Sequence, residues 1–506
     1  MSKYDDVVNL ALRRSLFFPA SEIYSDHPAG FFDFGPYGAA IRRKIISVWR
    51  RELVQKEGFL EIDGALALPK SVFEASGHLE GFNDPVTVCR KCGAVYRADK
   101  LLSEITGKEF KEAMDIKDLT AALRENKIVC PNKKCGGELS DVERSSLMVK
   151  AVVGVSEKSS DVYLRPETCQ NIFLDFARLF KTMRMKLPKG VSQVGLAFRN
   201  EISPRQTLIR SVEFSQMESE VFFDPERIDE IDGWEDVEDY EIMVMLGKDS
   251  PSLMKKVNST FLISAADLVR HNLVSGKLIA YFLARTQQFF ESLGLKREKM
   301  RFRELDSNER AFYAKEAFDF EVETSIGWLE LVANNYRTDH DLKGHMQGSK
   351  QDFSVVDDKT GRKFVPHVWE ISIGTNRTFY AVLENALKND KDRVVLSLKP
   401  NLAPLHAGVF PLLSNKPELV KKAKAIFDEL KSCYELVFDK TGSIGKRYAR
   451  LDEIGVPLCI TVDFDSLEND DVTIRDRDTA EQKRVKIKDL RDVLFKVLCG
   501  KPFSEL

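Results

Sequence analysis

Charged side chains interrupt two neighbouring strand patterns in residues 194–223. The run VGLAFRNEISPRQTLIRSVEFSQMESEVFF reads as two apolar strands joined by a polar loop, which predicts a β-hairpin. Six charged residues stand within or beside these half-buried strands, namely Arg199, Glu201, Arg210, Glu213, Glu218 and Glu220. Unpaired charge is costly in such a setting, so we expect these groups to have partners.

Two kinds of partner fit this pattern. A cross-strand ladder of salt bridges explains any single Arg/Glu pair. The whole set favours a ligand instead, because arginine binds phosphate oxygens bidentately and carboxylates bind an amine or a metal. The hairpin therefore indicates a nucleotide bound beside an amino acid.

Length and composition fit a large globular protein. A chain of 506 residues, 43% hydrophobic and 31% charged, should form two or three domains whose cores need no disulfides. No apolar run approaches the roughly 20 residues that span a bilayer, and the N-terminus lacks a signal-peptide core, so we expect a cytoplasmic protein without membrane contact. The net charge of −3 leaves any RNA contact to a local basic patch.

Two segments resemble the signature motifs of class II aminoacyl-tRNA synthetases. FRNE at 198–201, with its loop and the following strand, resembles motif 2, and EISIGTNR at 370–377, before a helical pattern over 378–387, resembles motif 3. The resemblance implies an α+β catalytic domain that binds ATP, built as an antiparallel sheet flanked by helices. A helix N-terminus with an arginine also suits ATP phosphates physically.

Further segments narrow the resemblance to glycyl-tRNA synthetases. A helix predicted over 39–57 and a strand over 60–68 resemble motif 1, which builds a dimer interface in class II synthetases. AGFFDFGPYG at 29–38 and LRPETCQ at 164–170 resemble the archaeal and eukaryotic homodimer type. Glu167 in the second segment has a structural explanation, since an acid suits the first turn of a helix. In the family, this glutamate holds the glycine ammonium group.

Four of the eight cysteines form two knuckles, with Cys89 and Cys92 in CRKC and Cys130 and Cys135 in CPNKKC. Paired thiolates beside turn residues suit tetrahedral Zn²⁺, and four thiolates leave no open position for water, so we expect a structural zinc. The alternative is four unrelated buried thiols. The other four stand singly in periodic segments and are expected in the core; they are Cys169, Cys433, Cys459 and Cys499.

The resemblance assigns ATP to motifs 2 and 3 and to a strand over 326–332. It implies three catalytic residues: Arg199 at the α-phosphate, Arg377 at the terminal phosphates, and Glu330, which holds Mg²⁺, an ion that prefers carboxylate and phosphate oxygens. Phe214 would lie under adenine. The expected ATP-binding residues are Arg199, Asn200, Glu201, Ile209, Arg210, Ser211, Val212, Glu213, Phe214, Glu330, Leu331, Gly374, Thr375, Asn376 and Arg377.

Glycine is assigned to a pocket whose carboxylates, Glu167, Glu218 and Glu370, surround the ammonium group. Arg97 matches an arginine that reaches the substrate pocket in the family. The expected glycine-binding residues are Arg97, Glu167, Phe214, Ser215, Gln216, Met217, Glu218, Glu370, Ile371, Ser372, Ile373 and Gly374.

The domains follow from the same patterns. We expect a catalytic domain over 1–392, with a zinc-knuckle insertion at about 84–145 and a second insertion at about 224–318 that holds one long helix over 264–290. From about 393 to 506, strands alternate with helices, which predicts an α/β domain. This part resembles the anticodon-binding domain of glycyl, histidyl, prolyl and threonyl synthetases, where Lys446, Arg447 and Arg450 would contact the tRNA backbone.

A glycyl-tRNA synthetase activates glycine with ATP to glycyl adenylate and transfers glycine to the 3′ end of tRNA(Gly); the resemblance implies this activity. A prolyl or threonyl synthetase is an alternative that Glu167 and Gln170 disfavour. A non-catalytic paralogue that binds RNA or serves as a polymerase accessory protein is another. Retention of the phosphate-binding residues argues against it.

Overall fold

The charged hairpin lies at the centre of a nine-stranded sheet. The computed structural model describes residues 2–112, 114–155, 160–202, 204, 206–247, 259–311, 313–357, 359–390 and 393–506. The strands lie in the order β13 (Thr260–Ser264), β12 (Glu241–Met245), β14 (Met300–Glu304), β15 (Glu316–Thr324), β16 (Gly327–Thr338), β19 (His367–Gly374), β11 (Glu213–Phe223), β10 (Lys189–Phe198) and β3 (Leu60–Ile62). Neighbours are antiparallel except the parallel pairs β12–β14 and β10–β3, which confirms the hairpin and the largely antiparallel sheet.

Alternation along the strands gives the sheet two different faces. One face packs against helices α2 (Pro36–Trp49), α9 (Lys277–Ser292) and α11 (Thr375–Ala386) in the largest hydrophobic core. On the other face, Glu218 lies opposite Ser372 and Glu220 lies opposite Glu370 in the register of β11 and β19. Because successive side chains in a strand point to opposite faces, the buried acids share one side of the sheet.

Shorter elements complete this part of the chain. The helices are α1 (Lys3–Arg13), α3 (Lys70–Ala75), α4 (His78–Gly81), α7 (Cys169–Thr182), α8 (Ala265–Arg270) and α10 (His340–Ser349). The strands are β1 (Phe17–Pro19), β2 (Phe32–Phe34), β4 (Ala67–Pro69), β8 (Val149–Val153), β9 (Ser160–Leu164), β17 (Val355–Val356), β18 (Lys363–Phe364), β20 (Leu387–Asp390) and β21 (Arg393–Leu396). Helix α7 packs with β10 and β11 in a second core around Phe173, Phe176 and Phe222.

The glycines of the 29–38 segment meet two other parts of the chain. A Cβ atom on Gly38 would lie 1.7 Å from the Leu16 carbonyl oxygen, and one on Gly35 would lie 2.0 Å from that of Ser15. The Gly30 carbonyl accepts a hydrogen bond from the N–H of Val212, the residue just before β11. Only glycine allows backbones to approach this closely. The contacts hold the segment against residues 15–16 and against the hairpin.

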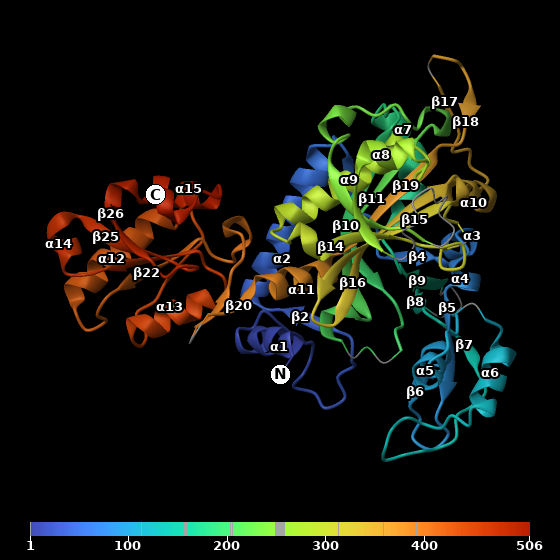
Figure 1. Ribbon diagram of the computed structural model, residues 1–506, viewed down its shortest axis with the longest axis horizontal. Coiled ribbons are helices and arrows are strands. Elements are labelled where there is room, and N and C mark those ends of the chain that lie inside the picture. The colour runs from blue at the N-terminus through green and yellow to red at the C-terminus, as the bar shows by residue number, and fades with distance from the viewer. Residues whose placement is uncertain are drawn as a thin grey trace.

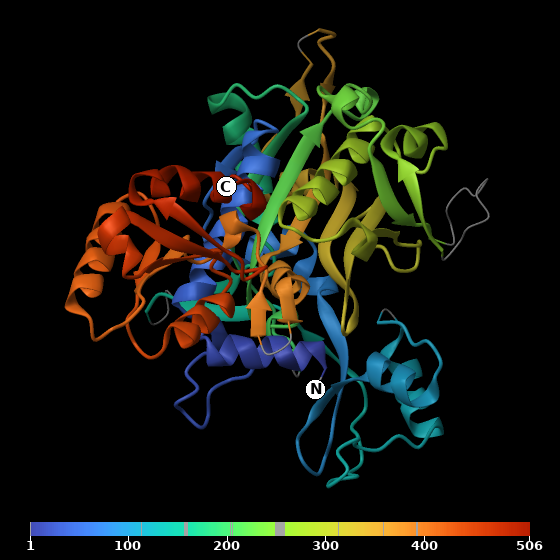
Figure 2. The same ribbon diagram turned by 60° about the vertical axis from the view of Figure 1, so that its left-hand side comes forward.

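The cysteine knuckles lie in an arm that projects from the sheet (Figures 1 and 2). The arm holds β5 (Asn83–Val88), β6 (Val95–Arg97), β7 (Glu143–Ser146), α5 (Ala98–Thr106) and α6 (Ile116–Glu125). Its strands form a small sheet in the order β6-β5-β7, and it has its own core of Leu101, Leu102, Leu119 and neighbours.

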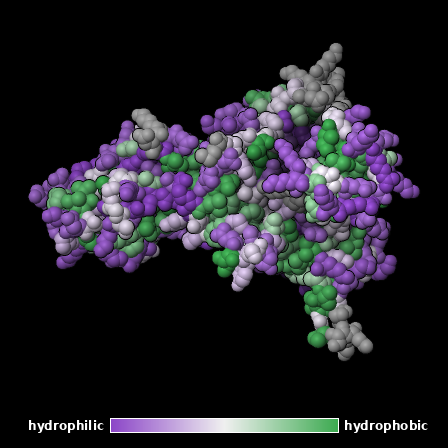
Figure 3. Space-filling view, turned by 90° about the horizontal axis from the view of Figure 1, so that it is seen from below, coloured by the Kyte–Doolittle hydropathy of each residue, from purple (hydrophilic) through white to green (hydrophobic). Residues whose placement is uncertain are grey.

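The C-terminal part forms a second lobe with a separate core (Figure 1). Its mixed sheet has the order β23 (Leu436–Phe438), β22 (Ala407–Pro411), β24 (Leu458–Val462), β25 (Asp471–Asp476) and β26 (Gln482–Lys486). Its helices are α12 (Pro417–Leu430), α13 (Ile444–Asp452), α14 (Asp465–Asn469) and α15 (Leu490–Leu498). Hydrophilic residues cover most of the molecular face seen in Figure 3, with small hydrophobic groups among them.

Several predicted elements are wrong in detail. The helix predicted over 264–290 is two helices, α8 and α9, because Asn272 adopts a left-handed φ of 52° and Gly276 is extended. The strand predicted over 60–68 is split between β3 and β4, which belong to different sheets. Cys433 and Cys499 are exposed rather than in the core, whereas Cys169 and Cys459 are buried as expected.

Candidate active site

A cavity of about 210 Å³ opens on the acidic face of the central sheet. Side chains from β11, β16, β19 and the start of α11 line it, together with residues between the two strands of the hairpin. The lining residues are Glu167, Arg199, Glu201, Leu208, Ile209, Arg210, Ser211, Phe214, Ser215, Gln216, Tyr313, Glu330, Leu331, Ala333, Asn335, Glu370, Ser372, Gly374, Asn376 and Arg377.

Three arginines of the cavity differ in their partners. Arg210 Nε donates to Glu201 Oε2 at 2.6 Å, and Arg377 Nη1 lies 3.2 Å from Glu330 Oε2. Among the described residues, the Arg199 guanidinium donates only to the Pro166 carbonyl, and no carboxylate lies within 4.0 Å of it. An anion in the cavity would find one unneutralised arginine and two whose pairs can open.

The acidic side of the cavity is held by a buried arginine. Arg337 Nη1 donates to Glu370 Oε1 at 2.8 Å, and two further bonds of 2.7 and 2.8 Å join its guanidinium to Asp341. Its guanidinium carbon lies 4.0 Å from the ring centroid of Tyr313. Asn335 Nδ2 donates to the other oxygen of Glu370 at 2.5 Å. These contacts fix the carboxylate at the cavity wall.

Glu370 and the acids next to it outnumber the single positive charge of Arg337. Glu218 accepts a bond of 2.8 Å from the Thr168 N–H, while both oxygens of Glu220 lack a hydrogen-bond partner among the described residues. Burial, opposed by Arg337, raises the pKa of Glu370 to about 8, and burial also raises the pKa values of Glu218 and Glu220. A cationic group in this cavity would be strongly stabilised.

Glu167 behaves differently from its acidic neighbours. Burial disfavours its charged form, but His78, Arg337 and the Cys169 thiol outweigh that effect and hold its pKa well below the usual range. The residue lies just before α7 and lines the cavity. It therefore presents an ionised carboxylate to any bound cation.

The structure brings most expected ATP-binding residues to the cavity wall. The expected residues that do not line it are Asn200, Val212, Glu213 and Thr375. Asn200 is exposed, and Thr375 is fully buried within the core side of α11. Glu213 and Phe214 are successive residues of β11, so their side chains point to opposite faces and only Phe214 reaches the cavity.

The expected glycine-binding set is divided by the same alternation. Met217, Ile371 and Ile373 pack into the hydrophobic core on the opposite face, so their side chains do not line the cavity. Glu218 lies behind the wall, fully buried against Thr168. The other residues expected there line the cavity, apart from Arg97.

Arg97 lies in the arm, and the prediction that its guanidinium reaches the glycine pocket is not met in this structure. Its guanidinium is held by Asp84 at 2.9 Å, Asp99 at 2.6 Å and Glu112 at 2.9 Å. Three carboxylates around one arginine satisfy its charge within the arm. Asp84 also lies 3.9 Å from Arg210, which lines the cavity. Arg97 is therefore linked to the cavity wall through Asp84 and does not line it.

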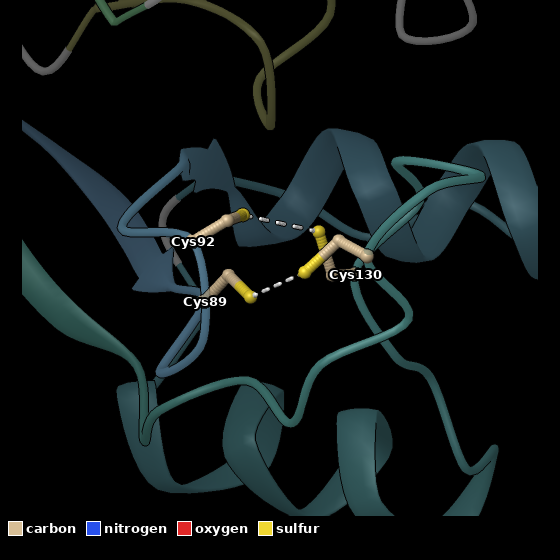
Figure 4. Close-up of side chains that lie close together, drawn as sticks. Cys89, Cys92 and Cys130 are labelled. Carbon is tan, nitrogen blue, oxygen red and sulfur yellow. Dashed lines mark hydrogen bonds between the residues drawn. The ribbon is translucent and has the colours of Figure 1, made fainter.

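The four knuckle cysteines come together in the arm, and Figure 4 labels three of them, Cys89, Cys92 and Cys130. The Cys89 and Cys135 sulfurs are 3.7 Å apart, those of Cys92 and Cys130 are 3.8 Å apart, and all four lie within 4.8 Å of one another. Four sulfurs about 2.3 Å from a zinc ion form a tetrahedron with edges of about 3.8 Å. The donor set and spacing fit zinc, and they argue against four unrelated thiols.

The sequence analysis missed several residues of the site. His78, Tyr313, Asn335 and Arg337 touch the acidic side of the cavity or its carboxylates, yet they come from three separate segments, since Asn335 and Arg337 share β16. The sequence did point to Glu220, because it belongs to the charged residues of the hairpin. No sequence pattern pointed to His78, since only the folded chain brings it to Glu167.

The C-terminal lobe corrects one expectation about basic residues. Arg447 is buried and donates to the Pro411 and Leu412 carbonyls, so it supports the fold rather than facing a ligand. Arg450 pairs with Asp439, while Lys446 is exposed. In the described part of the chain, no helix has the length and apolar character needed to cross a bilayer.

Comparison with known proteins agrees with this architecture. Residues 406–496 match the family model described as an anticodon binding domain. The chain is 37% identical to a glycine–tRNA ligase of Methanothrix thermoacetophila, across 100% of this chain and 99% of that protein. It is 36% identical to a glycine–tRNA ligase of Methanocaldococcus jannaschii, and 35% identical to one of Methanothermobacter thermautotrophicus, each across at least 97% of both chains.

A mixed, largely antiparallel sheet with flanking helices, an arginine-lined cavity and an anticodon-binding domain together define a class II aminoacyl-tRNA synthetase. The full-length similarity is specific within that class. The chain belongs to the glycine–tRNA ligase family.

Proposed function

We propose that this enzyme activates glycine with ATP and transfers the glycyl group to the 3′ end of tRNA(Gly). The observation that carries the proposal is the cavity itself, in which Arg199 and Arg377 share one small volume with Glu167 and Glu370. Arginines suit the triphosphate, and buried carboxylates suit the ammonium group of an amino acid.

The first step needs positioning rather than a general base. The glycine carboxylate is already a nucleophile: its oxygen attacks the α-phosphorus of ATP and pyrophosphate leaves. Arg199 is placed to contact the α-phosphate and Arg377 the terminal phosphates, while Phe214 and Glu201 would contact adenine. Fixed positive charge at the reacting phosphate stabilises the transition state. In the second step, the terminal ribose hydroxyl of tRNA attacks the glycyl carbonyl, the bond between that carbonyl and the phosphate oxygen breaks, and AMP leaves with the hydroxyl proton.

Glu330 would hold Mg²⁺ together with the ATP phosphates. Its carboxylate is half exposed at the cavity and bound only loosely to Arg377, so it can turn toward a cation. Carboxylate plus phosphate oxygens is ordinary coordination for this ion, which would neutralise phosphate charge when bound. The four arm cysteines would hold a structural Zn²⁺ that ties the two knuckles together.

The second lobe would bind tRNA(Gly), in keeping with its match to an anticodon binding domain. Homodimer formation and a cytoplasmic location stay predictions of the sequence. A sedimentation measurement at several protein concentrations tests the dimer directly.

ATP–pyrophosphate exchange across the amino acids, without tRNA, tests the activation step. We expect exchange with glycine and none with proline or threonine. Exchange with proline or threonine would overturn the assignment of the acidic cavity to glycine. No exchange from folded, zinc-loaded protein would show a non-catalytic paralogue.

A further inference from the structure

One oxygen of Glu167 collects several donors. Oε1 accepts from the Cys169 thiol at 2.9 Å and from Gln170 Nε2 at 3.2 Å, and His78 Nε2 lies 3.2 Å from the same atom. Arg337 is farther away, at 4.0 Å. Every described contact of the carboxylate goes to Oε1, which leaves Oε2 for a ligand in the cavity.

The imidazole of His78 is held on both nitrogens. Nδ1 lies 2.8 Å from the Ser76 hydroxyl, and Nε2 faces the Glu167 carboxylate. A carboxylate only accepts, so Nε2 carries the proton and donates to Glu167. The ring also packs edge-on against Phe73 and Phe82, and its side chain is 9% exposed. These contacts fix its position before any substrate arrives.

The other donors cannot replace His78. Arg337 is committed to Asp341 and Glu370 by three hydrogen bonds. Gln170 is neutral, and its amide oxygen is already bound to His345 at 3.0 Å. The thiol of Cys169 is a weak donor. His78 is thus the strongest close donor to the Oε1 atom.

We propose that His78 is a positioning residue of the amino-acid site, which holds Oε1 of Glu167 so that Oε2 meets the substrate ammonium group. This inference rests on the proposed function, in which Glu167 binds glycine. Loss of the Nε2 contact should free the carboxylate to rotate and weaken glycine binding, while the arginine-bound ATP is unaffected.

A matched pair of variants tests the role. The amide nitrogen of glutamine in His78→Gln reaches the place of Nε2, whereas that of the shorter side chain in His78→Asn reaches only the place of Nδ1. In ATP–pyrophosphate exchange we expect His78→Asn to raise the KM for glycine about tenfold, as for loss of one hydrogen bond to a charged group. The KM for ATP should stay within about twofold, and His78→Gln should recover most of the glycine affinity.

Two results would overturn the inference: equal increases in both KM values, or Asn and Gln variants that behave alike. Thermal unfolding midpoints for both variants separate a local effect from loss of the fold. Failure of the proposed function gives a different result, namely a wild-type enzyme that does not exchange with glycine. If the wild type activates another amino acid, the same comparison of KM values with that amino acid still decides the role of His78.

Discussion

Arg199 differs from the other cavity arginines because its charge is not neutralised by a carboxylate within 4.0 Å among the described residues. Its guanidinium carbon lies 5.2 Å from the ring centroid of Phe82 and 5.4 Å from that of Phe214. The rings and the Pro166 carbonyl orient the guanidinium without cancelling its charge. Such a group is preorganised for a phosphate.

Replacing Arg199 should therefore remove transition-state stabilisation. We expect Arg199→Ala to cost about 3 kcal/mol in glycine-dependent ATP–pyrophosphate exchange, as for loss of one preorganised donor. Arg199→Lys keeps the charge but lacks the planar guanidinium that donates two parallel hydrogen bonds, so the activity of this variant should be intermediate. Wild-type exchange by the alanine variant would remove Arg199 from the α-phosphate.

Glu167 provides a test of the ammonium assignment. Glu167→Gln keeps the size of the side chain but removes the charge that its neighbours hold in the ionised form. We expect the KM for glycine to rise about tenfold or more, with little change in the KM for ATP, since a charge-assisted bond is lost. Initial-rate exchange measured with each substrate varied checks this. Equal effects on both substrates would place the ammonium elsewhere.

Glu220 predicts a pH effect on stability. Burial and the neighbouring Glu370 and Glu218 raise its pKa in the folded state, so between its unfolded and folded pKa values the native protein binds more protons than the unfolded chain. Stability from this group is therefore present at low pH and is lost as pH rises. Glu220→Gln mimics the protonated acid, and its stability relative to wild type should increase from pH 5 to about pH 8. Urea unfolding at both pH values measures the difference; a constant difference would contradict the explanation.

At the scale of elements, period and register explain what the sequence predicted. Alternation in 194–223 predicted the hairpin, and the same alternation separates Glu218 and Glu220 from the core-facing Met217. The break between α8 and α9 was missed because Leu273 and Val274 continue an apolar pattern through the turn. Both turn residues are buried, so hydrophobicity alone could not show where the helix ends.

Side-chain partners from distant segments were beyond prediction. The spacing of the knuckle cysteines placed four sulfurs together correctly, because short loops fix pairs of ligands. Arg97 could not be placed in the same way, since its partners Asp84 and Glu112 depend on how the arm folds. His78 reaches Glu167 only through tertiary packing.

Zinc should stabilise the fold of the arm. The knuckles connect β5 and β6 to the loop after α6, and the arm's own core is small. Cys130→Ser should lower the zinc content from one ion per chain and expose the segment 92–130 to protease, because a lost ligand opens the site. Metal analysis and limited proteolysis of wild type and variant measure both effects. If the variant lacks zinc and its arm still resists protease, the hydrophobic core of the arm is sufficient to keep it folded.

At the scale of the whole molecule, the two lobes have separate hydrophobic cores, and the proposed function gives them separate tasks. Adjacent residues on α13 distinguish surface from core: Lys446 is exposed, whereas Arg447 is buried against backbone carbonyls. A cation that contacts tRNA phosphate affects the tRNA step alone. A cation that satisfies buried carbonyls affects stability.

These two residues should consequently give opposite results. Lys446→Glu should lower kcat/KM for tRNA aminoacylation about tenfold and leave ATP–pyrophosphate exchange unchanged, since like charge repels the RNA backbone. Arg447→Ala should destabilise the C-terminal lobe by about 3 kcal/mol through its unsatisfied carbonyls. Aminoacylation at several salt concentrations, exchange and thermal unfolding on both variants separate these effects. If Lys446→Glu charges tRNA as well as the wild type at low salt, the tRNA path does not cross this face of α13, and the contact must lie on another basic surface of the lobe.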